Sequence, residues 1–184
     1  MNFLAISGSL RAASLNSALL RATARLAPEG MSVRVFEGLG DLPLFNPDIE
    51  NTDPIAVAKL KAQIAAADAL IIASPEYAHG ITGALKNALD WLVSSEAFAN
   101  KPVALFNAAP RAVHAYASLR EIVTMMSAHV VNESSIVLPV SGSKLDEDEI
   151  YADPDMSASI RSALQSLSNA VVEFRGHEQY ETNR

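Results

Sequence analysis

Polar side chains suited to binding phosphate crowd into one short stretch near the start of the chain, which reads G-S-L-R-A-A-S-L-N at Gly8–Asn16. With the residue just before it, the stretch supplies three hydroxyls, a guanidinium and an amide: Ser7, Ser9, Ser14, Arg11 and Asn16. Hydroxyls bond phosphate oxygens at little steric cost, and a guanidinium adds a charge-assisted hydrogen bond. These residue types at this spacing predict an anion site.

The flanking segments predict how this stretch is held. The apolar run Phe3–Ile6 indicates a strand buried on both faces. Apolar residues then recur at the spacing of a buried helical stripe, at Leu15, Leu19, Ala22 and Leu26. The first amide groups of such a helix have no internal partners, and the helix dipole places positive charge there. An ordinary turn with Ser14 or Asn16 as the N-cap is the alternative, but capping needs only one such residue.

Two more loops carry ligand-type residues after predicted strands. S-P-E-Y-A-H-G (Ser74–Gly80) follows Ala69–Ala73, and N-A-A-P-R (Asn107–Arg111) follows Pro102–Phe106. Five strands alternating with five helices predict an α/β fold, a five-stranded parallel doubly wound sheet in one domain over 1–184. Because ligands bind beyond the carboxyl ends of such strands, we expect the three loops to converge there.

The last third of the chain supports three more predictions. Ser135–Val140 is expected to be the fifth strand, and the polar, acidic segment Ser141–Asp155 a solvated loop. Apolar residues spaced along 160–171 predict a last helix, followed by a frayed tail at Arg175–Arg184.

Composition excludes several kinds of function. A net charge of −7 argues against non-specific binding to nucleic acid or to an anionic membrane. The absence of cysteine excludes disulfides, thiolate catalysis and iron–sulfur clusters, so any redox chemistry belongs to a bound cofactor. The four histidines are scattered, and we predict no metal site. With no leader and no apolar run of about 18 residues, we expect a cytoplasmic protein without membrane contact.

The residues of the loops restrict the class of ligand that the site can bind. The first loop has one glycine, so it is neither a G-x-G-x-x-G dinucleotide turn nor a G-x-x-x-x-G-K-[ST] phosphate loop. A hydroxyl-rich first loop facing an aromatic second loop suits a mononucleotide with a large planar ring, as in FMN. The phosphate would bind at the first helix and the ring would lie against Pro75, Glu76 and Tyr77. A partly buried loop aromatic is the alternative for Tyr77.

Three motifs together resemble the NADPH-dependent FMN reductase family of flavodoxin-like proteins, which includes quinone, azo-dye and chromate reductases. They are the stretch Gly8–Asn16, L-P-L-F-N-P-D-I-E at Leu42–Glu50, and S-P-E-Y-A-H-G-I-T-G-A-L-K-N-A-L-D-W at Ser74–Trp91. The likeness runs from Met1 to about Arg120. It implies a flavodoxin-like three-layer sandwich, tightly bound FMN, NADPH or NADH as co-substrate, and ping-pong hydride transfer. It also implies a homodimer or homotetramer and a small-molecule acceptor, which is a quinone, a flavin, an azo compound or a metal oxyanion.

The resemblance also implies roles for single residues. The predicted phosphate contacts are Ser9, Arg11, Ser14, Leu15 and Asn16, and the predicted ring contacts are Pro75, Glu76, Tyr77 and Ala78. We add Asn107 and Arg111 as cofactor contacts from the third loop. Packing and subunit contacts are expected of Lys86, Asn87, Asp90 and Trp91. This chain departs from the family at Ala78, where asparagine is usual, and in the loop at 107–111, which is often rich in glycine and serine in relatives.

Three functions remain open at this stage. The first is an NAD(P)H:acceptor reductase, for which we nominate no catalytic side chain because the flavin carries the redox step. The second is a flavodoxin-like FMN electron carrier that does not itself oxidise NAD(P)H. The third is a module that binds a phosphate ligand without flavin. Protein that is reduced by NADPH favours the first, and protein that stays yellow favours the second.

Overall fold

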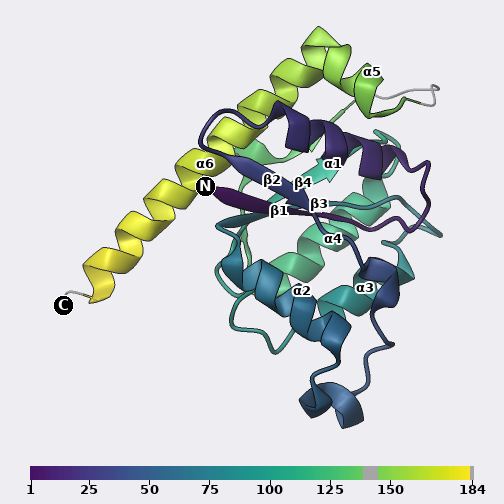
Figure 1. The fold of residues 1–184 in the computed structure, drawn as a ribbon, viewed down its shortest axis with the longest axis vertical. Helices are drawn as coiled ribbons and strands as arrows, with labels where there is room; N and C mark the ends of the chain where they lie inside the picture. The colour runs from purple at the N-terminus through teal and green to yellow at the C-terminus, as the bar shows by residue number, and fades with distance from the viewer. Residues whose placement is uncertain (139–144, 183–184) are drawn as a thin grey trace.

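Strands and helices alternate along the chain and build one parallel sheet with helices on both faces (Figure 1). The computed structural model describes residues 1–138 and 145–182. The strands are β1 (Asn2–Ser7), β2 (Ser32–Val35), β3 (Ala69–Ala73), β4 (Pro102–Asn107), β5 (His129–Val130) and β6 (Ile136–Val137). The helices are α1 (Leu15–Leu26), α2 (Ile55–Ala66), α3 (Gly83–Asp90), α4 (Val113–Met125), α5 (Glu147–Ala152) and α6 (Pro154–Thr182). Short 3₁₀ helices lie at Leu39–Asp41 (η1), Pro47–Thr52 (η2) and Asn132–Ser134 (η3).

The strand order is β2-β1-β3-β4-β5, with β6 also paired to β4, and every pairing is parallel. This doubly wound order confirms the predicted fold class. A separate core fills the space on each side of the sheet. On one face α1, α5 and α6 pack through residues such as Leu19, Ile150 and Leu164, and on the other α2, α3 and α4 pack through Leu60 and Leu89. The central strands are buried on both faces, which explains their continuous apolar runs.

Within the predicted fifth strand, Ser135–Val140, the described residues form only the short strand β6, and β5 lies before that range and was not predicted. β5 pairs with the start of β4, β6 pairs with its end, and η3 lies between them. The Ser135 hydroxyl accepts a hydrogen bond from the Leu105 amide (3.1 Å) and donates to the Val131 carbonyl (2.9 Å). Because this side chain takes the place of a backbone ladder bond, two short strands stand where one was predicted. Residues 139 and 140 lie outside the described residues.

The prediction that Ser141–Asp155 is a solvated loop is wrong for its second half, which forms α5 and the start of α6. Asp146 begins α5 with a capping box: its carboxylate accepts from the Glu149 amide (3.0 Å), and Glu149 accepts from the Asp146 amide (2.9 Å). Ile150 is fully buried against the sheet-side core. A cap and one buried anchor therefore make a helix of an acidic segment. Its first residues, 141–144, lie outside the described part.

The predicted frayed tail is also wrong over most of its length, because α6 continues to Thr182. An ion pair between Arg175 and Asp68, at the start of β3, ties this part of α6 to the body of the protein. Beyond it the helix projects past the sheet (Figure 1). Within the described ranges, no helix combines the length and the apolar character needed to cross a membrane.

Candidate functional site

A cavity of about 730 Å³ lies at the carboxyl ends of β1, β3 and β4, and we call it the strand-end cavity. It is lined by most of the predicted cofactor contacts, namely Ser9, Arg11, Ser14, Leu15, Asn16, Pro75, Glu76, Tyr77 and Arg111. The three loops therefore meet where the sheet topology predicted. The volume is within the range of cavities that hold small molecules and cofactors.

The first turn of α1 forms one wall of the cavity. Ser14 is the N-cap of this helix, and its Oγ accepts a hydrogen bond from the Ser17 amide at 3.4 Å, so the capping role is confirmed. That bond uses a lone pair, which leaves the hydroxyl proton of Ser14 free to bond an anion. The Ser9 hydroxyl accepts a hydrogen bond from the Arg11 amide at 3.3 Å, within the loop that leads into the helix. Capping and anion binding are thus compatible at this turn.

Asn16 gives a test of whether these residues fit a phosphate-bearing ligand. Its side chain is only 5% exposed, yet it lines the cavity. In the described part of the chain its Oδ1 is buried without a hydrogen-bond partner. Such a group costs about 1–3 kcal/mol, which a ligand can recover. Rotation of the amide presents either an acceptor for a ribityl hydroxyl or a donor for a phosphate oxygen, so the residue fits FMN.

Positive charge is placed locally in a protein that is acidic overall. Arg11, Arg21 and Arg111 all line the strand-end cavity. Arg21 donates to Glu147 of α5 at 2.8 Å, so its charge is offset. Among the described residues Arg11 and Arg111 have no acidic partner and are exposed. Two uncompensated guanidinium groups at the mouth of the cavity suit an anionic ligand.

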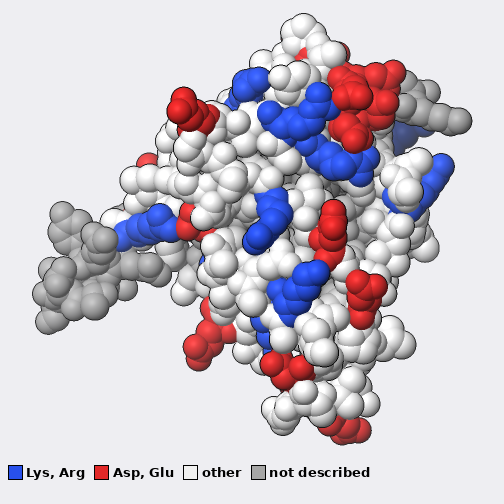
Figure 2. Space-filling model, viewed as in Figure 1, with Lys and Arg blue, Asp and Glu red and all other residues white. Residues whose placement is uncertain are grey.

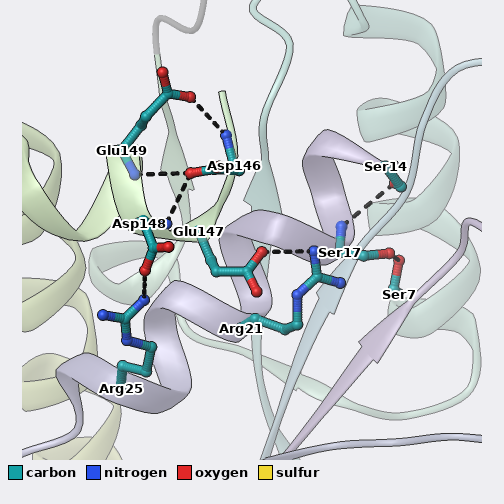
Figure 3. Close-up of polar contacts among 9 residues, drawn as sticks. All are labelled: Ser7, Ser14, Ser17, Arg21, Arg25, Asp146, Glu147, Asp148 and Glu149. Carbon is teal, nitrogen blue, oxygen red and sulfur yellow. Dashed lines mark hydrogen bonds and ion pairs between the residues drawn. The ribbon is translucent and has the colours of Figure 1, made fainter. Parts of the chain in front are cut away.

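Leu145 and Asp146, which lead directly into α5, are part of the cavity lining. Figure 2 shows basic and acidic side chains side by side where α1 meets α5. Figure 3 shows the ion pairs that join them, Arg21 with Glu147 and Arg25 with Asp148. The hydrogen bond from Arg21 lowers the pKa of Glu147. The start of this acidic segment therefore lines the site, and its helix is held to α1 by ion pairs.

Glu76 connects two of the three loops. Its Oε2 accepts hydrogen bonds from the backbone amides of His114 and Ala115, each at 2.9 Å. These amides belong to the first turn of α4, whose own N-cap residue, Ala112, provides no side-chain bond. The carboxylate of one loop therefore caps the helix that follows another. The bond from the Ala115 amide, with that from His114 and the nearby charges of His114 and His79, lowers the pKa of Glu76.

This lowered pKa predicts how Glu76 affects stability as the pH changes. A carboxyl group with a depressed folded-state pKa stabilises the protein above its unfolded-state pKa of about 4.5. That stabilisation is lost as the pH falls through the folded-state value. We therefore expect Glu76→Gln to lower the free energy of unfolding at pH 7 and to differ less from the natural protein below about pH 4.5. Urea unfolding across pH 3–7 measures this difference.

The matched control for that experiment is Glu121→Gln, which removes one negative charge from an exposed position later in α4. A difference between Glu76→Gln and the natural protein that stays constant over the whole pH range would contradict the capping role. The same pH dependence in Glu121→Gln would assign the effect to overall charge.

Two predicted cofactor contacts, Ala78 and Asn107, are not among the residues that line the cavity. Asn107 is buried and bonds its own loop: it donates to the Ala112 carbonyl (3.3 Å) and accepts from the Ala109 amide (2.9 Å). Its observed role is to shape the loop whose residues Ala109 and Ala112 line the cavity. Direct contact of Ala78 and Asn107 with a cofactor stays a prediction.

Asn87 and Trp91 of the predicted packing helix hold the loop at 42–46 in place. The Asn87 side chain accepts from the Phe45 amide (2.7 Å) and donates to the Pro43 carbonyl (2.9 Å). The fully buried Trp91 donates to the same Pro43 carbonyl at 2.8 Å. The structure thus gives these residues the packing role expected of them.

Sequence reasoning missed Arg21, Leu145 and Asp146 as cavity residues. Arg21 lies seven positions after Ser14 and so on the same face of α1, which is a signal that helical periodicity offers. For Asp146 the signal was the acidic residue followed three positions later by Glu149, the pattern of a helix start. A group of three or more metal-ligating side chains is not found among the described residues.

Comparison with known proteins identifies relatives over nearly the whole chain. A model of the family named NADPH-dependent FMN reductase matches residues 1–141. An NAD(P)H-dependent FMN reductase of Pseudomonas aeruginosa is 34% identical over 94% of this chain and 96% of its own length. A quinone reductase of Escherichia coli K12 is 32% identical over 76% of this chain and 78% of its own. The fold is shared with FerB, a flavoenzyme NAD(P)H:(acceptor) oxidoreductase of Paracoccus denitrificans. The two structures superpose with a TM-score of 0.71 at 23% identity, over 91% of this chain and 97% of FerB.

Proposed function

The chain belongs to the NADPH-dependent FMN reductase family, and from this premise we propose where its cofactor binds, which acceptor it reduces and in what order its substrates bind. It is an NAD(P)H-dependent oxidoreductase that uses FMN. When bound, FMN supplies the redox chemistry, hydride exchange with NAD(P)H and with the acceptor. The protein's share of the work is to bind and orient that cofactor.

FMN binds in the strand-end cavity with its phosphate at the first turn of α1. Support comes from Ser9, Arg11, Ser14 and Asn16, which gather there around a helix N-terminus. The buried, unpartnered amide oxygen of Asn16 is the observation that carries the placement. The isoalloxazine ring then lies against Pro75, Glu76 and Tyr77, the lining residues of the second loop.

The acceptor is a quinone, and NAD(P)H and the quinone bind in turn in a ping-pong order. Support for the quinone comes from the relative named quinone reductase, which covers about three quarters of the chain. Tyr77 at the edge of the cavity is 60% exposed and can pack beside a planar ring. Because NAD(P)H and the quinone both need the open face of the flavin ring, the reductant leaves before the acceptor enters. Free flavins, azo compounds and metal oxyanions are the alternative acceptors.

Mixing the FMN-loaded protein with NADPH, and separately with NADH, without oxygen tests this function. We expect the absorbance of the oxidised, yellow flavin to disappear after NADPH or NADH is added and to return when a quinone is added. A protein that stays yellow would be the electron carrier, and a protein that takes up no FMN would be the phosphate-binding module. Initial rates measured at several fixed quinone concentrations should give parallel double-reciprocal lines; lines that intersect would contradict the ping-pong order.

The protein is a homodimer or homotetramer, with α3 and α4 providing subunit contacts. Support comes from a second cavity of about 470 Å³ between these helices, which Lys86 and Asp90 help to line. Val93 and Met125 at the same cavity are apolar and highly exposed, at 67% and 80%. Sedimentation of the purified protein measures the number of subunits. Its cytoplasmic location also stays a prediction.

A further inference from the structure

The loop between β3 and α3 ends in a turn with an unfavourable backbone. The amides of Tyr77 and Gly80 each donate to the carbonyl of the other residue, both at 3.0 Å, which closes a two-residue turn. The central residues, Ala78 and His79, have φ angles of 48° and 61°. Turns with two positive φ angles favour Asn and Gly, because a Cβ is strained there. Neither central residue here is Asn or Gly, and the Cβ of Ala78 keeps the turn strained, so we expect it to need support from outside.

Two contacts supply such support, and both lead to the first turn of α4. The His79 ring stacks on the His114 ring with their centroids 4.2 Å apart and 27° between their planes. Glu76, directly before the turn, accepts hydrogen bonds from the amides of His114 and Ala115. The turn is thus held at two points by one segment that is more than thirty residues away in sequence.

The loop forms part of the strand-end cavity. Pro75, Glu76 and Tyr77 line it, and Ala78 and His79 continue directly from them. If the turn relaxed, these lining residues would move with it, because the two backbone bonds of Tyr77 belong to the turn. The stack is therefore connected to the cofactor wall without itself lining the cavity.

We propose that His79, His114 and Glu76 are positioning residues that fasten the strained β3–α3 turn to α4 and so hold the wall against which the flavin ring lies. The part of this inference that concerns the flavin rests on the proposed function. The part that concerns the turn does not, since it can be measured without any ligand.

His114→Ala tests the inference through two measurements. In the ligand-free protein we expect the amides of Tyr77 and Gly80 to exchange their hydrogens about two- to tenfold faster. This factor corresponds to the stabilisation that one pair of stacked rings contributes. The dissociation constant for FMN should rise by a similar factor. His114→Phe keeps an aromatic partner for His79 and should restore both values. His129→Ala removes a histidine that contacts the Phe174 ring at the opposite end of the sheet, and it should change neither.

A second variant tests the strain itself. Ala78→Gly removes the Cβ that makes a positive φ unfavourable, so His114→Ala should cost less in that background. Unchanged amide exchange in His114→Ala, a failure of His114→Phe to restore it, or an equal cost in both backgrounds would each overturn the inference. Absence of FMN binding by the natural protein, with the amide results as expected, would instead overturn the proposed function.

Discussion

Replacing Arg11 with alanine should raise the dissociation constant for FMN about 10- to 100-fold and leave that for riboflavin unchanged. Riboflavin carries the same ring and ribityl chain without the phosphate, so it does not need the guanidinium. Arg11 lines the strand-end cavity beside the N-terminus of α1 and has no acidic partner among the described residues. A hydrogen bond to a charged group is worth about 1.5–3 kcal/mol, which gives the expected factor. Titration of flavin fluorescence measures both constants.

Arg34→Ala is the matched control, because Arg34 is exposed on β2 and is not part of the cavity lining. It should leave both constants unchanged. The dissociation constant for FMN should also depend more steeply on salt concentration in the natural protein than in Arg11→Ala, because the variant lacks one charged contact with the phosphate. If Arg11→Ala weakened the binding of riboflavin as much as that of FMN, the guanidinium would act on the ring or on the fold, and the placement of the phosphate would be wrong.

Replacing Gly8 with alanine should lower the free energy of unfolding by about 1–3 kcal/mol and weaken FMN binding as well. A Cβ at Gly8 would lie 2.8 Å from the Ser74 Oγ and 3.1 Å from the Leu85 Cδ2. Both backbone groups of Gly8 also make hydrogen bonds: its amide donates to the Ala73 carbonyl (2.7 Å), and its carbonyl accepts from the Thr82 hydroxyl (2.5 Å). The first and second loops therefore meet at this residue with no room for a methyl group. Thermal unfolding should show a loss of about 2–4 °C for each kcal/mol.

Gly83→Ala is the control for this prediction, because a Cβ there meets no atom within 4 Å. That variant should be as stable as the natural protein or slightly more so, since alanine favours a helix over glycine. Combining Gly8→Ala with Ser74→Gly removes the Ser74 side chain that the new methyl group would strike, and it should recover part of both losses. Equal unfolding midpoints for Gly8→Ala and Gly83→Ala would show that the contact between the loops is not tight.

The alternation of apolar and polar segments predicted the fold correctly, because the pattern within each strand or helix follows from which of its own faces are buried. β1, β3 and β4 are continuous apolar runs in sequence and are buried on both faces in the structure. Two of the errors arose where side chains bonded the backbone. Ser135 took over a ladder bond beside β6, so that two short strands stand where one was predicted. Asp146 with Glu149 capped a helix inside a segment that composition alone assigned to solvent.

The sequence by itself determined the polar turn at Gly8–Asn16 and the edge of the sheet to which it belongs. These follow from residue types next to one strand and one helix start, so neighbours in the chain suffice. Only the tertiary structure decided that α5 pairs with Arg21 beside the cavity, and that Glu76 and His79 contact the first turn of α4. Those contacts join residues far apart in the chain, and which of many possible charged or aromatic partners meet depends on how the helices pack on the sheet.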